Sequence, residues 1–184
     1  GQVPMETPDA VLKFWFEETT PGQWYATDTS FDRLITERFG ETHRAATAGE
    51  LAHWRDSAEG RLAEVIVLGQ FSRNIYRDDP RSFASDVAAL ILAQEAIARG
   101  IGPALSATMR AFLYMPFMHS ESAAIHQTAL ALFGEQDMEN NLDFEIRHKT
   151  IIDRFGRYPH RNAILGRVST TEELAFLQED GSSF

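Results

Sequence analysis

Hydrophobic residues recur at the three- and four-residue spacing of an α-helix along most of the chain. In the clearest case, one helix face between residues 31 and 46 carries seven residues suited to a core: Phe31, Leu34, Ile35, Phe39, Thr42, Ala45 and Ala46. The signals of strands, alternating β-branched residues and Asn-Gly turns, are missing from the sequence. The pattern therefore predicts an all-α protein.

Capping residues and helix stops predict eight or nine helices joined by short loops. The predicted helices begin near Thr7-Pro8, Phe31, Glu59, Asp79-Pro80, Ser106, Ser120, Leu142 and Ser169. Neither a linker nor a shift in composition divides the sequence, so residues 1–184 are expected to form one domain of antiparallel helix pairs. Residues 1–6, which open with Gly-Gln rather than Met, are expected to be disordered or foreign to the fold.

Three boundary signals make specific predictions. Pro116 should break or kink the helix that starts at Ser106, because proline lacks the N–H that the helix interior needs. Ser120 is predicted to cap the next helix, which should end near Gly134. The run from Ser169 to Glu172 matches a capping box, with a hydroxyl at the helix start and a carboxylate three residues later.

Composition excludes several classes of protein. The formal charge is -10, from 17 basic and 27 acidic residues, which argues against a nucleic-acid partner because such binding depends on neutralising phosphates. The chain has no cysteine, which excludes disulfide frameworks, thiolate metal sites and thiol nucleophiles. The absence of cysteine also fits a reducing cytoplasm, where we expect the protein to lie. No apolar run approaches the roughly 20 residues that cross a bilayer, so no membrane partner is expected.

Basic residues are concentrated in one segment near the C-terminal end. Residues 147–167 hold six of the 17 basic side chains against a single carboxylate, Asp153: Arg147, Lys149, Arg154, Arg157, Arg161 and Arg167. Planar guanidinium groups bind carboxylate and phosphate through paired hydrogen bonds, so this cluster is a candidate anion site. The alternative is that these arginines form internal ion pairs with the acidic excess elsewhere in the chain.

A second group of basic residues follows the third predicted helix and consists of Arg73, next to Asn74, and Arg77. Arg73 and Arg77 share a helix face if that helix continues far enough. The pair Arg73-Asn74 is similar to Arg161-Asn162 in a related local sequence, which suggests that two Arg-Asn corners meet in one site. The alternative is that each asparagine caps a helix end.

The sequence His119-Ser120-Glu121 could supply a general acid and base at a helix junction. A hydrogen-bonded structural role for His119 is the alternative. His119 and His126 are seven residues apart with no evident third ligand, so we predict no metal site. Ser120 lacks the nucleophile elbow of a serine hydrolase, and glycine-rich phosphate loops are missing, so no cofactor is expected.

Aromatic residues occupy adjacent positions at Phe14-Trp15-Phe16 and at Trp24-Tyr25. Three consecutive helical side chains cannot all face the core, so at least one of the first three should line a groove or a subunit contact. The pair at Trp24-Tyr25 is expected in a loop, where it could line a ligand site or an interface.

Several longer motifs resemble one bacterial family. They are Phe14-Trp15-Phe16, the segments 70–74 and 112–121, and above all the segment 154–167, which reads Arg-Phe-Gly-Arg-Tyr-Pro-His-Arg-Asn-Ala-Ile-Leu-Gly-Arg. Together they resemble the family called domain of unknown function 924, from about Pro8 to Phe184. The resemblance implies an all-helical, tetratricopeptide-like fold of stacked helical hairpins with a concave face. It implies no activity.

The polar signature that the resemblance carries over falls on nine residues of this chain: Arg73, Asn74, His119, Glu121, Arg157, His160, Arg161, Asn162 and Arg167. One position departs from the family pattern. Gly69 stands where the resemblance leads us to expect aspartate. A role for that aspartate as a base or a metal ligand is therefore excluded here.

Three functional hypotheses follow. In the first, the chain binds a phosphorylated or carboxylated small molecule, or an acidic peptide end, through eight residues: Arg73, Asn74, Arg77, Arg157, His160, Arg161, Asn162 and Arg167. In the second, the same pocket serves a hydrolase or transferase in which His119 and Glu121 transfer protons. In the third, the chain is an interaction scaffold with a helical groove and purely structural arginine ion pairs. None of the three specifies an oligomeric state.

Overall fold

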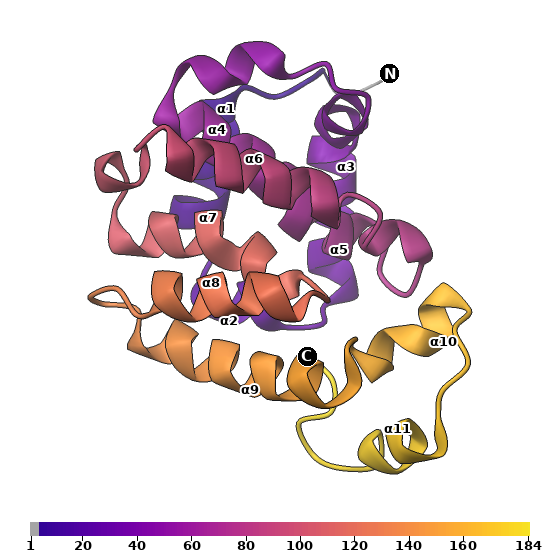
Figure 1. The fold of residues 1–184 in the computed structure, drawn as a ribbon. Coiled ribbons are helices and arrows are strands. Elements are labelled where there is room, and N and C mark those ends of the chain that lie inside the picture. The colour runs from indigo at the N-terminus through magenta and orange to yellow at the C-terminus, as the bar shows by residue number, and fades with distance from the viewer. Residues whose placement is uncertain (1–3) are drawn as a thin grey trace.

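The computed structural model describes residues 4–184, and every regular element in that part of the chain is helical (Figure 1). The α-helices are α1 (Pro8–Lys13), α2 (Pro21–Tyr25), α3 (Thr29–Thr47), α4 (Ala58–Ile66), α5 (Ser72–Ile75), α6 (Asp86–Ala98), α7 (Ala107–His119), α8 (Ala123–Phe133), α9 (Glu139–Phe155), α10 (Asn162–Leu165) and α11 (Thr171–Phe176). The predicted all-α class is confirmed. The helices outnumber the prediction because short ones such as α2, α5 and α10 give little periodic signal.

Shorter helical turns connect these elements. Tight 3-10 turns lie at Ala52–Asp56, Pro80–Ser82, Gly102–Ala104 and Pro159–Arg161, and wider π-helical turns at Phe14–Glu18 and Val67–Phe71. The second π turn joins α4 to α5, so the chain stays helical from residue 58 to residue 75. Arg73 therefore lies near the end of this continuous helical segment.

Helices α6 to α9 form an antiparallel stack in which each helix packs against the next (Figure 1). Helix α4 packs against α1, α6 and α7, and so joins the N-terminal helices to the stack. After α9 the chain turns at Gly156, whose positive φ of 73° suits glycine, and enters the segment that carries α10 and α11. The predicted antiparallel helix pairs are therefore present in the stack.

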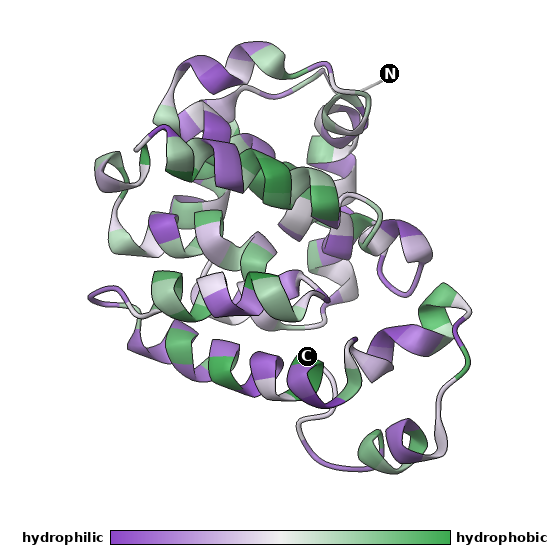
Figure 2. Ribbon diagram, viewed as in Figure 1, coloured by the Kyte–Doolittle hydropathy of each residue, from purple (hydrophilic) through white to green (hydrophobic). Residues whose placement is uncertain are grey.

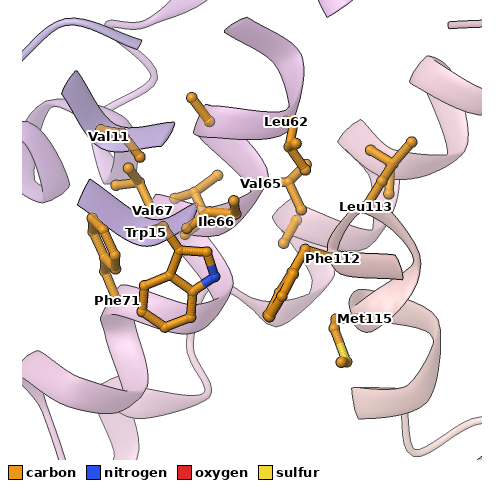
Figure 3. Close-up of a cluster of buried hydrophobic side chains, with 14 of the residues drawn as sticks. Val11, Trp15, Leu62, Val65, Ile66, Val67, Phe71, Phe112, Leu113 and Met115 are labelled. Atoms are coloured by element: carbon orange, nitrogen blue, oxygen red, sulfur yellow. The ribbon is translucent and has the colours of Figure 1, made fainter. Parts of the chain in front are cut away.

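Trp15 lies at the centre of the core, between Phe71 and Phe112 (Figure 3). Its ring is fully buried and meets both phenyl rings edge-on, each at 5.7 Å between centroids. Phe14 is also buried, whereas Phe16 is half-buried. Its ring packs near Phe112 at 5.6 Å, so the three consecutive aromatics divide between the core and its edge as their spacing requires.

Two predicted helix starts have the expected caps. The backbone N–H of Ala10 donates to Thr7 Oγ1 at 3.1 Å, and Pro8 occupies the first turn of α1. Likewise, the hydroxyl of Ser106 accepts from a backbone N–H in the first turn of α7.

Two boundary predictions are wrong, and the predicted break at Pro116 does not occur. Helix α8 is capped by Ser122, and Ser120 instead follows the last residue of α7. The capping box lies one residue later than predicted, between Thr170 and Glu173. Pro116 neither ends nor divides α7, because the helix residues around it are all buried and their packing outweighs one lost hydrogen bond.

The predicted fourth helix also starts later than expected. Asp79 caps only a 3-10 turn, at Pro80–Ser82, and α6 begins at Asp86. Helix α6 is rich in hydrophobic residues along its length (Figure 2). Two of them, Val87 and Ile91, are more than half exposed. None of the helices in residues 4–184 is long and apolar enough to cross a membrane.

The sequence predicted that residues 1–6 would be disordered or foreign to the fold. Residues 1–3 lie outside the described chain. Glu6, by contrast, is attached to α3: its backbone N–H donates to Thr42 Oγ1 at 2.8 Å, and its carboxylate lies 3.5 Å from Arg38 Nε.

Candidate functional site

A cavity of about 510 Å³ lies where α2, α5, α7 and α9 meet the segment after α9. This volume falls in the usual range for sites that bind small molecules. Its polar lining combines three arginines and three histidines: Arg73, Arg77, Arg161, His119, His148 and His160. Five of these six side chains were candidates from the sequence, so the fold brings together residues from distant motifs.

Arg161 is the most deeply buried arginine of the cavity, with 5% of its surface exposed. Its Nη2 donates to the backbone carbonyl of His119 at 3.0 Å, while its Nε is buried with no hydrogen-bond partner. The nearest carboxylates, of Asp86 and Glu121, lie 3.8 and 3.9 Å from Nη1. Burial and the neighbouring charge of Arg73 lower the pKa of Arg161 to about 10, which leaves the group charged at neutral pH.

The guanidinium of Arg161 also lies over two aromatic rings. Its central carbon is 4.5 Å from the centroid of Phe83 and 4.8 Å from that of Tyr158. Such cation–π contacts hold a guanidinium in place without using its hydrogen-bond donors. Arg161 is therefore positioned firmly while one of its donors stays free.

Asp86 joins the two Arg-Asn motifs. Arg73 donates to both oxygens of Asp86, at 2.8 and 3.0 Å, and Arg161 approaches the same carboxylate. The arginines of the two motifs thus meet as the sequence suggested. Their asparagines do not: Asn74 lines the cavity and donates to Asp32, whereas Asn162 lies outside the cavity.

Arg77 and Asn74 are both held by Asp32 of α3. Arg77 donates to its two oxygens at 2.6 and 2.9 Å, and the amide of Asn74 donates to one of them at 2.9 Å. Burial opposes ionisation of Asp32, yet the hydrogen bonds from Arg77 and Asn74 prevail and lower its pKa. This internal pair leaves Arg77 at the cavity wall with much of its charge already neutralised.

The three cavity histidines are neutral at neutral pH. Burial lowers the pKa of His148 and of His160 to about 4, and burial together with Arg73 and Arg161 places that of His119 well below its usual value. The ring of His119 makes no hydrogen bond within the described chain, and Nδ1 of His160 is buried without a partner. Two imidazoles of the cavity therefore have unused hydrogen-bonding capacity.

Glu121 does not pair with His119. Its two oxygens accept both terminal nitrogens of Arg167, at 2.9 and 3.0 Å, and one of them also accepts the backbone N–H of Tyr158 at 2.7 Å. Burial raises the pKa of Glu121, but the hydrogen bonds from Arg167 and Tyr158 outweigh that effect and lower it. A carboxylate held in this way stays ionised, and it is bound to Arg167 and not to its predicted partner, His119.

Three further predicted ligand-binding residues do not line this cavity. Arg157 donates to both oxygens of Glu173, at 2.9 and 2.7 Å. The side-chain oxygen of Asn162 accepts Nε of Arg167 at 2.9 Å. Arg157 and Arg167 thus have the carboxylate partners that the ion-pair alternative predicts, and Asn162 is hydrogen-bonded to Arg167.

Gly69 faces open space despite being buried. A Cβ at this position would meet no atom within 4 Å, and the carbonyl oxygen of Gly69 accepts a hydrogen bond from Arg73 at 3.2 Å. A side chain could therefore be accommodated beside Arg73, but this chain supplies none.

His126 lies seven residues after His119, and no metal site is predicted for this pair. The side chain of His126 is fully buried, and both its ring nitrogens have hydrogen-bond partners. Nδ1 lies 2.7 Å from Glu145 Oε2, and Nε2 lies 2.6 Å from the carbonyl oxygen of Ser120. Across residues 4–184, no three histidine or acidic side chains are placed to hold a metal ion.

Comparisons with known proteins agree with this architecture. The family model described as "Bacterial protein of unknown function (DUF924)" matches residues 11–181. The chain belongs to this family. A solved structure, that of a protein of unknown function from Agrobacterium tumefaciens, is 38% identical, with a TM-score of 0.87 over 93% of this chain and 96% of the other. A search of the curated proteins gives no match.

This DUF924 member has a second cavity, of about 470 Å³, next to the first. Phe83, His119 and Arg161 line both cavities and so form their common wall. The second cavity is mostly apolar but also contains Asp86 and Glu121, whose carboxylates would repel an anion. An anionic group therefore fits better in the larger cavity, on the side of Arg73 and Arg77.

Sequence reasoning missed three residues that shape the site in this DUF924 member. His148 looked like one more polar position of α9, yet it lines the cavity. Asp86 and Asp32 give the counter-charges for Arg73 and Arg77 from first turns of other helices. The sequence does place Asp32 and Asp86 near helix starts. Acidic residues are common there because they interact favourably with the helix dipole, so their position alone did not identify them as partners of the arginines.

Proposed function

We propose that the chain binds a small ligand bearing a carboxylate or phosphate in the larger cavity, with Arg161 as the anchor of the acidic group. The observation that carries this proposal is the state of Arg161, which is charged, lines the larger cavity and has both nearby carboxylates beyond hydrogen-bond distance of Nη1. A largely buried guanidinium charge without a carboxylate in hydrogen-bond contact is costly, and the acidic group of a ligand would reduce that cost.

The lining of the larger cavity supports an anion rather than a cation. Its charged side chains are Arg73, Arg77 and Arg161 against Asp78. Although Arg73 and Arg77 have internal partners, their charges add to the field at the position of an incoming anion. The neutral histidines add hydrogen bonds without cancelling this field.

A proton-transfer role for His119 is a second candidate. Its imidazole lines both cavities, is neutral, and makes no hydrogen bond to the described chain, so it is available as a base to a bound ligand. Glu121 would not assist, since Arg167 holds it. In an enzyme of this kind Arg161 would position an acidic substrate, and His119 alone would accept the proton.

Direct titration with inorganic phosphate tests the anion site. We expect wild type to bind phosphate and Arg161→Met, which removes the charge while keeping an unbranched side chain, to lose most of that binding. A ligand at about 100 times its Kd stabilises a protein by about 2.7 kcal/mol, so thermal unfolding should report the same difference as a shift of several degrees.

Arg99→Met is the matched control. Arg99 is exposed on α6 and pairs only with Glu95 four residues earlier, so this variant should bind phosphate like wild type. Equal binding by all three chains would refute the proposal and favour the scaffold hypothesis, in which every arginine is structural.

The cytoplasmic location expected from the sequence remains a prediction.

A further inference from the structure

The exposed aromatic side chains of this protein are gathered at one place. Among residues 4–184, three aromatic side chains expose more than a third of their surface: Tyr25 at 63%, Phe144 at 49% and Phe184 at 55%. They come from α2, from α9 and from the last position of the sequence, yet all three line the larger cavity. Aromatic surface left open around a cavity is characteristic of a site that receives an apolar or planar group.

His148 adds a hydrogen-bond acceptor of fixed orientation. Its Nδ1 lies 2.6 Å from the backbone carbonyl of Phe144, which can only accept, so Nδ1 carries the proton. Burial keeps the imidazole neutral at neutral pH. Nε2 therefore carries a lone pair, and this atom makes no hydrogen bond and is not sealed from the cavity.

These two features specify more of the ligand than its charge. We infer that the cavity takes an aromatic anion that also carries a hydroxyl or N–H: its ring lies against the exposed aromatic side chains, its acidic group at Arg161, and its donor at Nε2 of His148. This inference rests on the proposed function, since Arg161 supplies the anchor. It excludes purely aliphatic acids and simple inorganic anions as the preferred ligands.

Two aromatic rings pack against His148. The ring of Phe184 lies 3.7 Å from that of His148 between centroids and is tilted by 49°, and Tyr158 meets His148 edge-on at 5.7 Å. The imidazole that carries the acceptor is thus held in place by its aromatic neighbours.

Matched probes test the inference on the wild-type protein without relying on any variant. We would titrate acetate, inorganic phosphate, 3- and 4-methylbenzoate and 3- and 4-hydroxybenzoate at about pH 7.5, with ligand-observed NMR for weak binding. Methyl and hydroxyl groups are similar in size, so each pair of benzoates differs mainly in the donor. We expect the aromatic acids to bind at least about tenfold more tightly than acetate. For at least one position we expect the hydroxyl form to bind about threefold to tenfold more tightly than the methyl form.

His148→Phe then identifies the acceptor. This variant keeps a planar ring but has no lone pair, so the hydroxyl advantage should disappear while binding of the methylbenzoates persists. Arg161→Met should weaken binding of every probe. Binding of phosphate with no preference for aromatic acids would overturn the inference and leave the anion site intact. Equal binding of both members of each benzoate pair would contradict the hydrogen bond from the ligand to His148. If no probe bound at all, the anion site itself would be refuted.

Discussion

Arg161 donates a hydrogen bond from Nη2 to the backbone carbonyl of His119, over 3.0 Å and across 42 positions of sequence. That carbonyl belongs to the last residue of α7, where helical carbonyls lack partners within the helix. The contact satisfies it, and it fixes the wall that the two cavities share. Arg161 therefore has a structural role, and direct binding measurements must separate it from the binding role that we propose.

Replacing Asp86 should make the protein less stable and the cavity more attractive to anions. Asp86→Asn removes the carboxylate that accepts two hydrogen bonds from Arg73 and lies near Arg161. We expect the free energy of unfolding to fall by about 1–3 kcal/mol, because a largely buried guanidinium loses its partner. Phosphate should bind this variant more tightly than wild type, since two guanidinium groups are left without their counter-charge.

Urea unfolding with and without phosphate measures both effects. Glu95→Gln is the control, because Glu95 pairs with Arg99 on an exposed face of α6 and neither stability nor phosphate binding should change measurably. Weaker phosphate binding by Asp86→Asn would mean that Asp86 orients the arginines for the ligand rather than competing with it.

The cavity histidines should make stability fall in mild acid. Burial lowers the pKa of His148 and of His160 from 6.5 to about 4, so between these values the unfolded chain binds protons that the folded chain does not. The free energy of unfolding therefore decreases as the pH drops from about 6.5 to 4, by up to about 1.4 kcal/mol per pH unit for each histidine. Carboxylates such as Asp32, whose pKa is lowered, lose their contribution at lower pH, and Glu145, whose pKa burial raises, acts in the opposite direction.

His148→Asn isolates one of these protons. The Asn amide nitrogen occupies the position of Nδ1 and keeps an N–H for the carbonyl of Phe144 but does not titrate, so stability measured by urea unfolding at about pH 7.5, 6 and 5 should depend less steeply on pH than in wild type. Identical slopes would show that His148 titrates alike in the folded and unfolded chains.

Two glycines in helices should respond in opposite directions to alanine. A Cβ at Gly40, within α3, meets no atom within 4 Å, so Gly40→Ala should stabilise by about 0.5–1 kcal/mol through reduced backbone entropy of the unfolded chain. A Cβ at Gly60, in the first turn of α4, would collide with the carbonyl oxygen of Trp54, so Gly60→Ala should destabilise by about 1–3 kcal/mol. Thermal unfolding of the two variants checks this, and equal effects would contradict the close approach of Trp54.

Tyr158 fastens the segment after α9 to the helix stack. Its hydroxyl donates to the carbonyl of Met118 at 2.6 Å and lies 3.1 Å from His126 Nε2, in a fully buried position. Tyr158→Phe should lower the free energy of unfolding by about 1–2 kcal/mol, because it leaves that carbonyl buried without a partner. Tyr25→Phe, at an exposed ring, should be neutral in the same urea titration.

The sequence predicted the helices better than it predicted the partners of polar side chains. Periodic burial identified α3 and the end of α9, and the caps at Thr7 and Ser106 followed from local chemistry. Arg157 and Arg161 looked equivalent, since both lie in one basic run. Their roles differ because Glu173 neutralises the first, whereas the second meets carboxylates only at 3.8 Å or more.

Such distinctions depend on contacts between distant parts of the chain. Glu121 looked like a partner for its neighbour His119, yet Arg167 reaches it across 46 positions. No local pattern encodes that choice, because it is decided by how the segment after α9 returns to the end of α7. Pro116 shows the same limit in another form, since burial of its neighbours overrode its local preference.

The antiparallel order of α6 to α9 has a consequence for the way the protein folds. Helices that are neighbours in the chain are also neighbours in space, so the stack can assemble from local contacts and should form rapidly. The larger cavity closes only when His160 and Arg161 reach the end of α7. On the ribosome, the helix stack would thus be synthesised before the residues that close the larger cavity, so the cavity would form later than the stack that supports it.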